Sequence, residues 1–303
     1  MNQHRSALDW LYIVMLSALW GSAFVFIKIA APAIGAVGLV FARLILASLL
    51  LGALFIRKEH FTMIKENIFP IILIGATNVA LPFYCFSYAA LEINASTMSV
   101  INGSTPLFAF LFSILWLSFQ FKWFQFLGIL IGMSGLVVFV GYESLEFSRL
   151  PILVAMIGAA MYGLSMSYIY KLNVVDTGVM AAITMVAATI MITPFLLLDP
   201  IIMDNWDLKV VGSVVFLGIF CTGLAYLPYF ILIKRVGPIS TSLVALLVPI
   251  FGMLWAYLLL KETITLTMLG GCLLIIMGVL LTNLRTVSYT HLRAHETSLH
   301  LVC

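Results

Sequence analysis

The chain has 303 residues, of which 63% are hydrophobic and only 9% are charged, and its mean hydropathy is +1.18. A soluble domain of this size cannot bury so much apolar surface, because about a quarter of an ordinary globular sequence is charged. The net charge of +3 comes from basic residues in short connections rather than in a patch, which argues against a nucleic-acid partner and leaves the lipid bilayer as the main solvent.

Apolar runs long enough to cross a membrane follow one another along almost the whole chain. A hydrocarbon core of about 30 Å requires ~20 apolar residues of helix. Ten runs meet this requirement, at about residues 8–31, 34–56, 68–91, 95–117, 123–142, 150–170, 178–198, 209–233, 239–260 and 265–284. The first run is too long for a cleaved signal peptide and reads as a retained span. The sequence therefore predicts an all-α integral membrane protein with ten transmembrane helices.

Lys and Arg in the connections predict the orientation of these spans. With the N-terminus in the cytoplasm, nine basic residues fall on the cytoplasmic side and three, Arg149, Lys209 and Lys261, fall on the outer side. Positive charge in short loops marks the cytoplasmic face of membrane proteins. We therefore expect a multi-pass protein with both termini in the cytoplasm.

The stretch from Gly75 to Gly135 recurs once in the chain. A shift of 143 residues places Gly75 on Gly218, Pro106 on Pro249 and Gly135 on Gly278. This period predicts two copies of one unit, in residues 1–142 and residues 143–286. Five spans per copy is an odd number, so the second copy enters the membrane inverted. Inverted repeats are typical of secondary transporters, whose substrate site lies near the midplane between the halves.

Several local motifs carry a family resemblance. The first span reads ALWGSAFVFIK over Ala18–Lys28, the fourth and ninth spans contain proline, and the ninth ends in a KET sequence. This order resembles the EamA family of the drug/metabolite transporter (DMT) superfamily over nearly all of Leu8–Leu284. The resemblance implies a ten-helix carrier of the bacterial inner membrane that moves small metabolites or amino acids, commonly outward. It also implies a central cavity lined chiefly by spans 1, 3, 4, 6, 8 and 9.

One departure from the family pattern concerns the ends of spans four and nine. Family members often show a Gly-Glu pair where span four ends. Here Gln120 and Lys122 stand in that region, and the second copy has Lys261–Glu262. A gating role for a carboxylate at the first of these ends is not expected.

Two basic residues within spans are candidate functional groups, because intramembrane charges are costly. Arg43 lies about ten residues into span two and would act as a counter-charge for a substrate carboxylate or as a gate latch. The alternative is an Arg satisfied by backbone carbonyls of span one. Lys28 would attract anionic substrates at the outer mouth, or would extend to the outer interface as long basic side chains do.

Neutral polar and aromatic side chains supply the remaining candidates for a substrate site. Asn78, Asn102 and Thr105 lie in the first copy, where Pro106 frees the carbonyl of Asn102. The second copy is less polar there, so we expect a lopsided cavity. The full set of substrate-binding candidates is Trp20, Arg43, Asn78, Tyr84, Asn102, Thr105, Tyr162, Thr222, Tyr226 and Trp255. Helix kinks and gating positions are predicted at Pro82, Pro106, Pro228 and Pro249.

The sequence predicts a secondary carrier that works by alternating access and exports small metabolites such as amino acids or related zwitterions. An alternative is an uptake carrier for a nucleoside-like metabolite, stacked on Trp20 or Tyr226. A remote alternative is an intramembrane enzyme, but the spans hold no histidine and no acidic cluster for such chemistry. The four cysteines fit no metal or disulfide spacing, so we expect no cofactor and no metal. Beyond lipid and solute no partner is indicated, and the sequence is compatible with a monomer.

The last residues differ from everything before them. Residues 287–303 begin with the polar sequence VSYTHLRAHET, which resembles the translation of a sequencing adapter. We expect the natural sequence to end near Thr286, and we leave this tail out of the functional reasoning.

Overall fold

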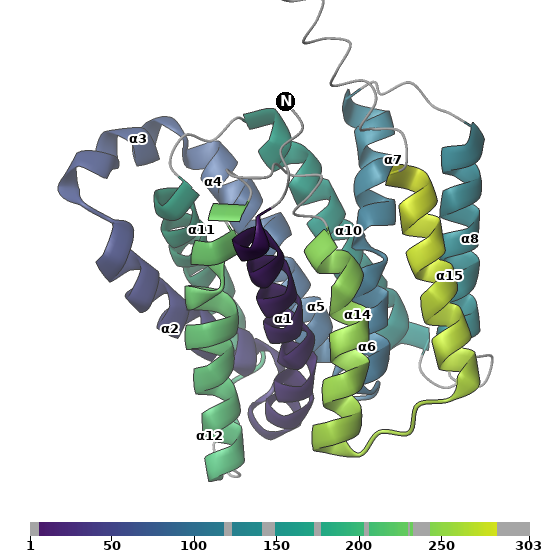
Figure 1. Cartoon of the computed structure of the whole chain (residues 1–303). Helices are drawn as coiled ribbons and strands as arrows, with labels where there is room; N and C mark the ends of the chain where they lie inside the picture. The colour runs from purple at the N-terminus through teal and green to yellow at the C-terminus, as the bar shows by residue number, and fades with distance from the viewer. Residues whose placement is uncertain are drawn as a thin grey trace, which may run out of the picture.

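The computed structural model (Figure 1) describes residues 6–117, 123–140, 149–172, 177–202, 206–229, 231–232 and 243–283. Within these ranges the chain forms helices and no strand. The predicted tail 287–303 and the residues Gln120 and Lys122 lie outside the described part of the chain.

The first half of the chain is a series of helices joined by short connections. They are α1 (Ala7–Ile34), α2 (Ala36–Phe55), the short 3-10 helix η1 (Lys58–His60), α3 (Phe61–Glu66), α4 (Ile68–Ile74), the π-helical η2 (Gly75–Ala80), α5 (Leu81–Ala89), α6 (Ala95–Gly103), α7 (Thr105–Leu117) and α8 (Trp123–Val140). Helices α4, η2 and α5 run on from one another and together fill the third predicted span.

The second half follows the same order. Its helices are α10 (Arg149–Leu172), α11 (Thr177–Ile192), the 3-10 helix η3 (Thr193–Leu197), α12 (Leu208–Val215), the π-helical η4 (Phe216–Leu224), α14 (Leu243–Trp255), the π-helical η5 (Ala256–Leu260) and α15 (Leu266–Asn283). Helices thus occupy each of the ten predicted ranges.

The helices suit a membrane environment by both length and composition. Five helical segments are long and apolar enough to cross a bilayer by themselves: Ala7–Ile34, Ala36–Phe55, Ile68–Ala89, Gly178–Leu197 and Leu208–Tyr229. The others are shorter apolar helices, and large side chains such as Leu49, Leu115 and Leu266 are exposed on the outer surface. Apolar side chains of this size on so many helices require lipid rather than water around them.

The fourth predicted span is divided two residues before Pro106, one of the positions at which the sequence predicts a helix kink. Helix α6 ends at Gly103, Ser104 lies between the two helices, and α7 begins at Thr105. Pro106, the second residue of α7, has no N–H to donate to the carbonyl of Asn102 four residues earlier, so the helical hydrogen bond that would span Ser104 cannot form. A proline at the start of a helix is well tolerated, so the chain breaks before Pro106 instead of kinking around it.

Helix packing is reciprocal between the two halves. Helix α1 packs against α14 and against α12 and η4, while its counterpart α10 packs against α7 and against α5 and η2. The pairs α2 with α11 and α8 with α15 each join one helix to its own counterpart. Figure 1 shows α8 and α15 side by side at one end of the molecule. Two similar units in contact through equivalent surfaces, as the sequence predicts, would give this pattern of contacts.

Two glycines show the same correspondence between the halves: Gly21 of α1 lies against α14, and Gly163 of α10 lies against α7. A Cβ added to Gly21 would lie 2.8 Å from the backbone nitrogen of Gly252 and 2.8 Å from Cβ of Phe251. A Cβ added to Gly163 would lie 2.6 Å from the backbone nitrogen of Ala109 and 2.8 Å from Cβ of Phe108. These distances leave no room for a methyl group, because the neighbours are backbone and Cβ atoms rather than flexible side-chain ends.

We expect Gly21→Ala and Gly163→Ala each to lower the free energy of unfolding by about 1–3 kcal/mol, since both overpack a helix crossing. Gly212→Ala and Gly270→Ala are matched controls, because nothing lies within 4 Å of a Cβ at either position. The controls are expected to be neutral or to stabilise by about 0.5–1 kcal/mol through helix propensity. Thermal unfolding in detergent gives the melting temperature of all four variants. Equal melting temperatures for the two crossing variants and the two controls would contradict the close helix crossings.

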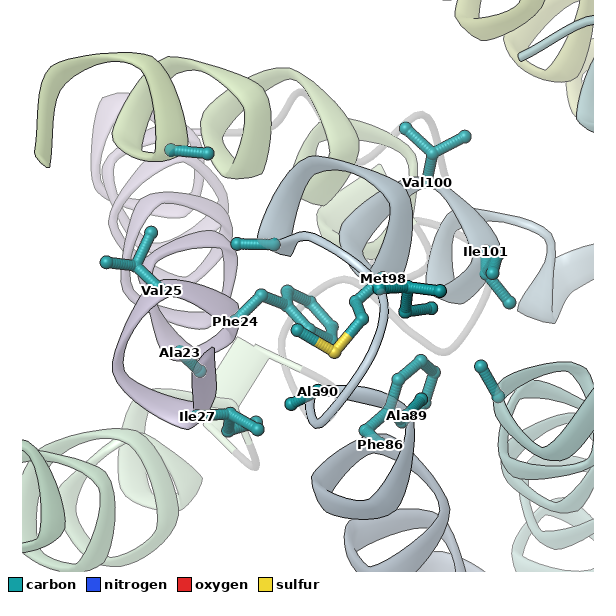
Figure 2. Packing of buried hydrophobic residues seen from close by; sticks show 14 of the residues in the cluster. Ala23, Phe24, Val25, Ile27, Phe86, Ala89, Ala90, Met98, Val100 and Ile101 are labelled. Atoms are coloured by element: carbon teal, nitrogen blue, oxygen red, sulfur yellow. The ribbon is translucent and has the colours of Figure 1, made fainter. Parts of the chain in front are cut away.

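A compact apolar core closes the region around the C-terminal third of α1. Phe24, Phe86 and Met98 converge there from α1, α5 and α6, as Figure 2 shows. The rings of Phe24 and Phe86 meet edge to face with their centroids 5.3 Å apart. Ala30, Ala31 and Ile34 of α1 are completely buried beyond them. Among the residues that the structure describes, these side chains pack closely around this end of α1.

Candidate functional site

A cavity lies between the two halves, next to the core that closes around the end of α1. Its volume is about 150 Å³, which is enough for several waters or a small solute. The lining residues are Trp20, Ala23, Phe24, Ile27, Arg43, Asn78, Phe83, Phe86, Asn102, Thr105, Tyr162, Cys221, Tyr226, Tyr229, Val244, Ala245 and Val248. They come from the predicted spans 1, 3, 4, 6, 8 and 9, with Arg43 of span 2 in addition.

Much of the lining consists of residue pairs related by the repeat. A shift of 143 residues takes Asn78 to Cys221, Phe83 to Tyr226, Phe86 to Tyr229, Asn102 to Ala245 and Thr105 to Val248, and all ten residues line the cavity. The first copy supplies two amides and a hydroxyl where the second supplies a thiol, a methyl and an isopropyl group. The second copy supplies two phenols where the first has phenyl rings. The cavity is therefore built from equivalent positions but is chemically lopsided, as the sequence analysis expected.

Arg43 contributes the positive charge of the cavity wall. Its side chain is only 3% exposed. Nε and Nη2 donate hydrogen bonds to Oγ1 of Thr222 at 3.2 and 2.9 Å, and Cζ lies 3.8 Å from the centroid of the Phe83 ring. The sequence also allowed hydrogen bonds from Arg43 to backbone carbonyls of span one. The hydrogen bonds found among the described residues go to the Thr222 hydroxyl instead. The guanidinium joins α2 of the first half to η4 of the second.

Aromatic rings form the wall around Trp20. The Trp20 ring meets Tyr229 edge to face at 5.1 Å and Tyr226 at 6.2 Å, and its Nε1 donates a 3.0 Å hydrogen bond to the carbonyl of Cys221. On the other wall, Tyr162 stacks on Phe86 with ring centroids 6.3 Å apart. Edge-to-face and stacked pairs hold rings in defined orientations, so both walls are rigid surfaces for a bound solute.

Seven of the ten predicted binding candidates line the cavity, and three do not. The seven are Trp20, Arg43, Asn78, Asn102, Thr105, Tyr162 and Tyr226. Of the others, Thr222 lies behind the wall and holds Arg43, and Trp255 donates a 3.0 Å hydrogen bond to the carbonyl of Ala18. Tyr84 faces Tyr88 at 6.2 Å. These contacts give the position of each residue relative to the cavity. A role in solute binding remains a prediction for all ten residues.

Lys28 and Glu262 lie away from the cavity, at the end that the sequence predicts to be the outer one. Lys28 Nζ donates a 2.8 Å hydrogen bond to the carbonyl of Ala90. The Glu262 carboxylate accepts from the backbone N–H groups of Ala95 and Ser96, at 2.8 and 3.0 Å, and from the Ser96 hydroxyl at 2.6 Å. Glu262 thus caps the N-terminus of α6 from the opposite half of the chain.

Lys261, the residue before Glu262, has a backbone conformation that glycine adopts more readily than other residues. It is the only residue other than glycine with a positive φ in the described part of the chain, at 59°. The left-handed turn ends η5 and directs Glu262 back toward α6. The lysine side chain itself is exposed to solvent.

Four prolines are predicted to kink or gate helices. Of these, Pro82, Pro106 and Pro228 lie just after a change in helix geometry, and Pro249 lies inside a helix. Pro82 follows the π-helical η2, and Pro106 follows the break at Ser104. Pro249 lies inside α14 and contacts Gly103 of α6. Pro228 lies in the helical turn after η4. A π-helical stretch is a frequent feature of functional sites, and both η2 and η4 carry cavity residues.

Sequence reasoning missed several members of the wall, including Phe83, Phe86, Cys221 and Tyr229. The repeat was the signal that could have found two of them, because the shift of 143 residues relates Cys221 to the candidate Asn78 and Phe83 to the candidate Tyr226. Among the described residues no group of histidine, cysteine or acidic side chains is arranged to hold a metal ion.

Comparisons with known proteins agree along almost the whole chain. The model of the EamA-like transporter family matches residues 9–141 and again residues 149–284. A protein of Archaeoglobus fulgidus named as an uncharacterized transporter is 26% identical over 274 residues, covering 89% of this chain and 96% of that protein.

A second relative has a more informative name. The "Probable terminal-alkyne amino-acid exporter" of Streptantibioticus cattleyicolor is 25% identical over 286 residues, covering 91% of this chain and 93% of its own length. Among solved structures, one crystal structure aligns with a TM-score of 0.62 at 17% identity, over 92% of this chain and 98% of its own. At this identity the structural match shows a shared fold and nothing about substrate.

Proposed function

Because the chain belongs to the EamA-like transporter family and is a multi-pass membrane transporter, we propose that it is a secondary carrier working by alternating access on small metabolites. The observation that carries this proposal is the cavity between the halves, lined by pairs of residues that the repeat relates. A transporter of this family does no covalent chemistry on its solute, so the enzyme alternative is set aside.

Inversion of the second unit is part of the proposal. The reciprocal contacts, in which α1 packs on α14 and α10 packs on α7, support a two-fold relation between the units. Five membrane-crossing helices in each unit would place that axis in the membrane plane. Rocking of two such units about a midplane cavity is the usual route to alternating access.

Orientation follows from charge. With nine basic residues in the connections on one side and three on the other, both termini would lie in the cytoplasm, and the membrane would be the bacterial inner membrane. The closed end near Lys28 and Glu262 would then face outward. The conformation described here would be one with the outer gate shut, which suits loading from the cytoplasm and supports export.

Amino acids and related zwitterions are the proposed solutes. The wall offers one cation, two amides and three phenols beside apolar rings, which suits a small molecule with charged and apolar parts. The amino-acid name of the Streptantibioticus relative points the same way. Uptake of a nucleoside-like metabolite is the rival, and the aromatic wall around Trp20 favours it, because a base would stack there.

Purified protein in liposomes tests the proposal. We expect labelled amino acid to exchange against internal amino acid, with competition by amino acids and none by nucleosides. Competition by nucleosides alone would favour the rival, and no exchange of either class would contradict a small-metabolite carrier. Liposomes in which the protein has one known orientation test the direction of transport. For an exporter we expect faster transport of solute supplied at the cytoplasmic face.

Trp20→Ala and Asn102→Ala are expected to weaken solute binding by about tenfold each, because one removes an aromatic wall and the other an amide. Trp255→Ala is the matched control for Trp20, since the indole N–H of each tryptophan donates to a backbone carbonyl of another helix, but Trp255 lies outside the wall. Ligand-induced thermal shifts in detergent measure all three. Unaltered shifts in both wall variants would remove the assignment of this cavity as the binding site.

A further inference from the structure

The cavity wall carries a buried cation, Arg43, with which no described acidic side chain forms an ion pair. Among the residues the structure describes, Arg43 makes no ion pair, and its hydrogen bonds from Nε and Nη2 both end on the uncharged Thr222 hydroxyl. The Phe83 ring adds a favourable but uncharged contact. Buried charges are normally paired, because an isolated ion in a low-dielectric interior is unfavourable.

The third nitrogen of the guanidinium, Nη1, has no partner within the described part of the chain. Nη1 donates no hydrogen bond to any described residue, and Arg43 is one of the residues that line the cavity. Because Thr222 holds the other two nitrogens, the orientation of the guanidinium is set before a solute arrives. A preorganised donor of this kind favours an anionic acceptor in the cavity.

A second polar group in the same wall also lacks a partner. The Thr105 side chain is 4% exposed, it lines the cavity, and its Oγ1 has no hydrogen-bond partner among the described atoms. An unpartnered buried hydroxyl lowers stability unless something else satisfies it. Thr105 and Arg43 come from different helices, α7 and α2, and both line this one cavity.

We propose that the cavity recognises the carboxylate of a monoanionic or zwitterionic solute, with Arg43 as its counter-charge and Thr105 as a further hydrogen-bonding group. This inference rests on the proposed carrier function and narrows its solute class. One cationic side chain neutralises one carboxylate, and the apolar surfaces of Phe24, Ile27 and Val248 receive the uncharged part of the solute. A phosphate dianion would keep a net negative charge in this wall, which favours the carboxylate.

Matched solutes test this without any substitution. Isothermal titration of the wild-type protein in detergent compares each amino acid with its carboxamide and with its deaminated acid. We expect the amino acid and the deaminated acid to bind, and the carboxamide to bind at least about tenfold more weakly. The neutral amide of the carboxamide carries no negative charge to pair with the Arg43 guanidinium. Inorganic phosphate is included and is expected to compete poorly.

Variants then assign the preference to residues. Arg43→Gln is expected to abolish the discrimination between acid and carboxamide, while Arg43→Lys retains part of it. Thr105→Val is expected to weaken acid binding about five- to tenfold without lowering the melting temperature of the solute-free protein, because its hydroxyl has no partner to lose. Ser165→Ala is the matched control, since its buried hydroxyl is equally unpartnered but lies outside the cavity wall.

The outcomes separate this inference from the carrier function. Equal binding of acids and carboxamides by the wild type would overturn the carboxylate site while leaving a carrier of neutral solutes. Preferential binding of phosphate, or an acid preference that survives in Arg43→Gln, would overturn it as well. If no solute binds and none exchanges in liposomes, the proposed function fails and the inference falls with it. Should Arg43→Gln not fold, the wild-type comparison and Thr105→Val still decide.

Discussion

Replacing Glu262 with alanine is expected to lower the free energy of unfolding by about 2–4 kcal/mol, one of the two largest effects we predict for a single side chain. Its carboxylate accepts three hydrogen bonds from Ala95 and Ser96 at the start of α6, two of them from backbone amides. Without it those amides lose their acceptor at the N-terminus of a mostly buried helix. The melting temperature in detergent measures the loss.

Glu92 is the matched control for Glu262. It precedes α6, its side chain is exposed, and no hydrogen bond or ion pair of its carboxylate is found within the described residues. Glu92→Ala is therefore expected to melt with the wild type, as isolated surface charges contribute little. Equal destabilisation by the two substitutions would contradict a specific cap.

The Glu262 contact also joins the two proposed units at the end we expect to be the outer gate. Its removal should favour an outward-open conformation, because the three hydrogen bonds that are lost stabilise the conformation described here. Accessibility of a cysteine placed at Ser99, which packs against Gly252 in the closed state, reports that shift. Increased labelling from the outer side in Glu262→Ala is the expected result, and unchanged labelling would separate the cap from gating.

Thr222→Val is expected to lower the free energy of unfolding by about 2–3 kcal/mol, although valine has nearly the shape of threonine. The substitution removes the only hydroxyl to which Arg43 donates in the described structure, and so leaves a buried guanidinium with no hydrogen bond. Loss of one partner of a buried charge is far more unfavourable than loss of a neutral contact. Thermal unfolding in the absence of solute measures the effect.

Thr222→Ser serves as the comparison, because it keeps the hydroxyl and removes only a methyl group. It is expected to cost about 1 kcal/mol or less. A double substitution with Arg43→Met would restore part of the stability lost in Thr222→Val, since no charge then remains unsatisfied. A serine variant as unstable as the valine variant would mean that packing, and not the Arg43 hydrogen bonds, explains the loss.

Much of this architecture is readable from the sequence because membrane helices are local features. Each span must be apolar for its full length, so the runs are visible without knowledge of their neighbours. The repeat is visible because glycines and prolines such as Pro106 and Pro249 hold the same places in both copies. The intramembrane polar residues Arg43, Asn78, Asn102 and Thr105 stand out for the same reason, and all four line the cavity.

Which face of each helix meets the cavity was not readable. A helix that is apolar all round shows no contrast between a buried and a lipid-facing side. Adjacent residues are rotated by about 100° on a helix, so a choice that is wrong by one position selects the wrong face. Tyr84 was selected where Phe83 lines the cavity, and Thr222 was selected where Cys221 does.

The sequence by itself thus determined the solvent of this protein, its helices, its repeat and the polar groups that its spans carry, because each depends on composition along a single run. Tertiary structure decided the rest. Only the fold brings Glu262 to the start of α6 and Thr222 to Arg43, 167 and 179 residues apart in the chain. Partners so distant in sequence leave no local pattern, since their meeting depends on how whole helices pack.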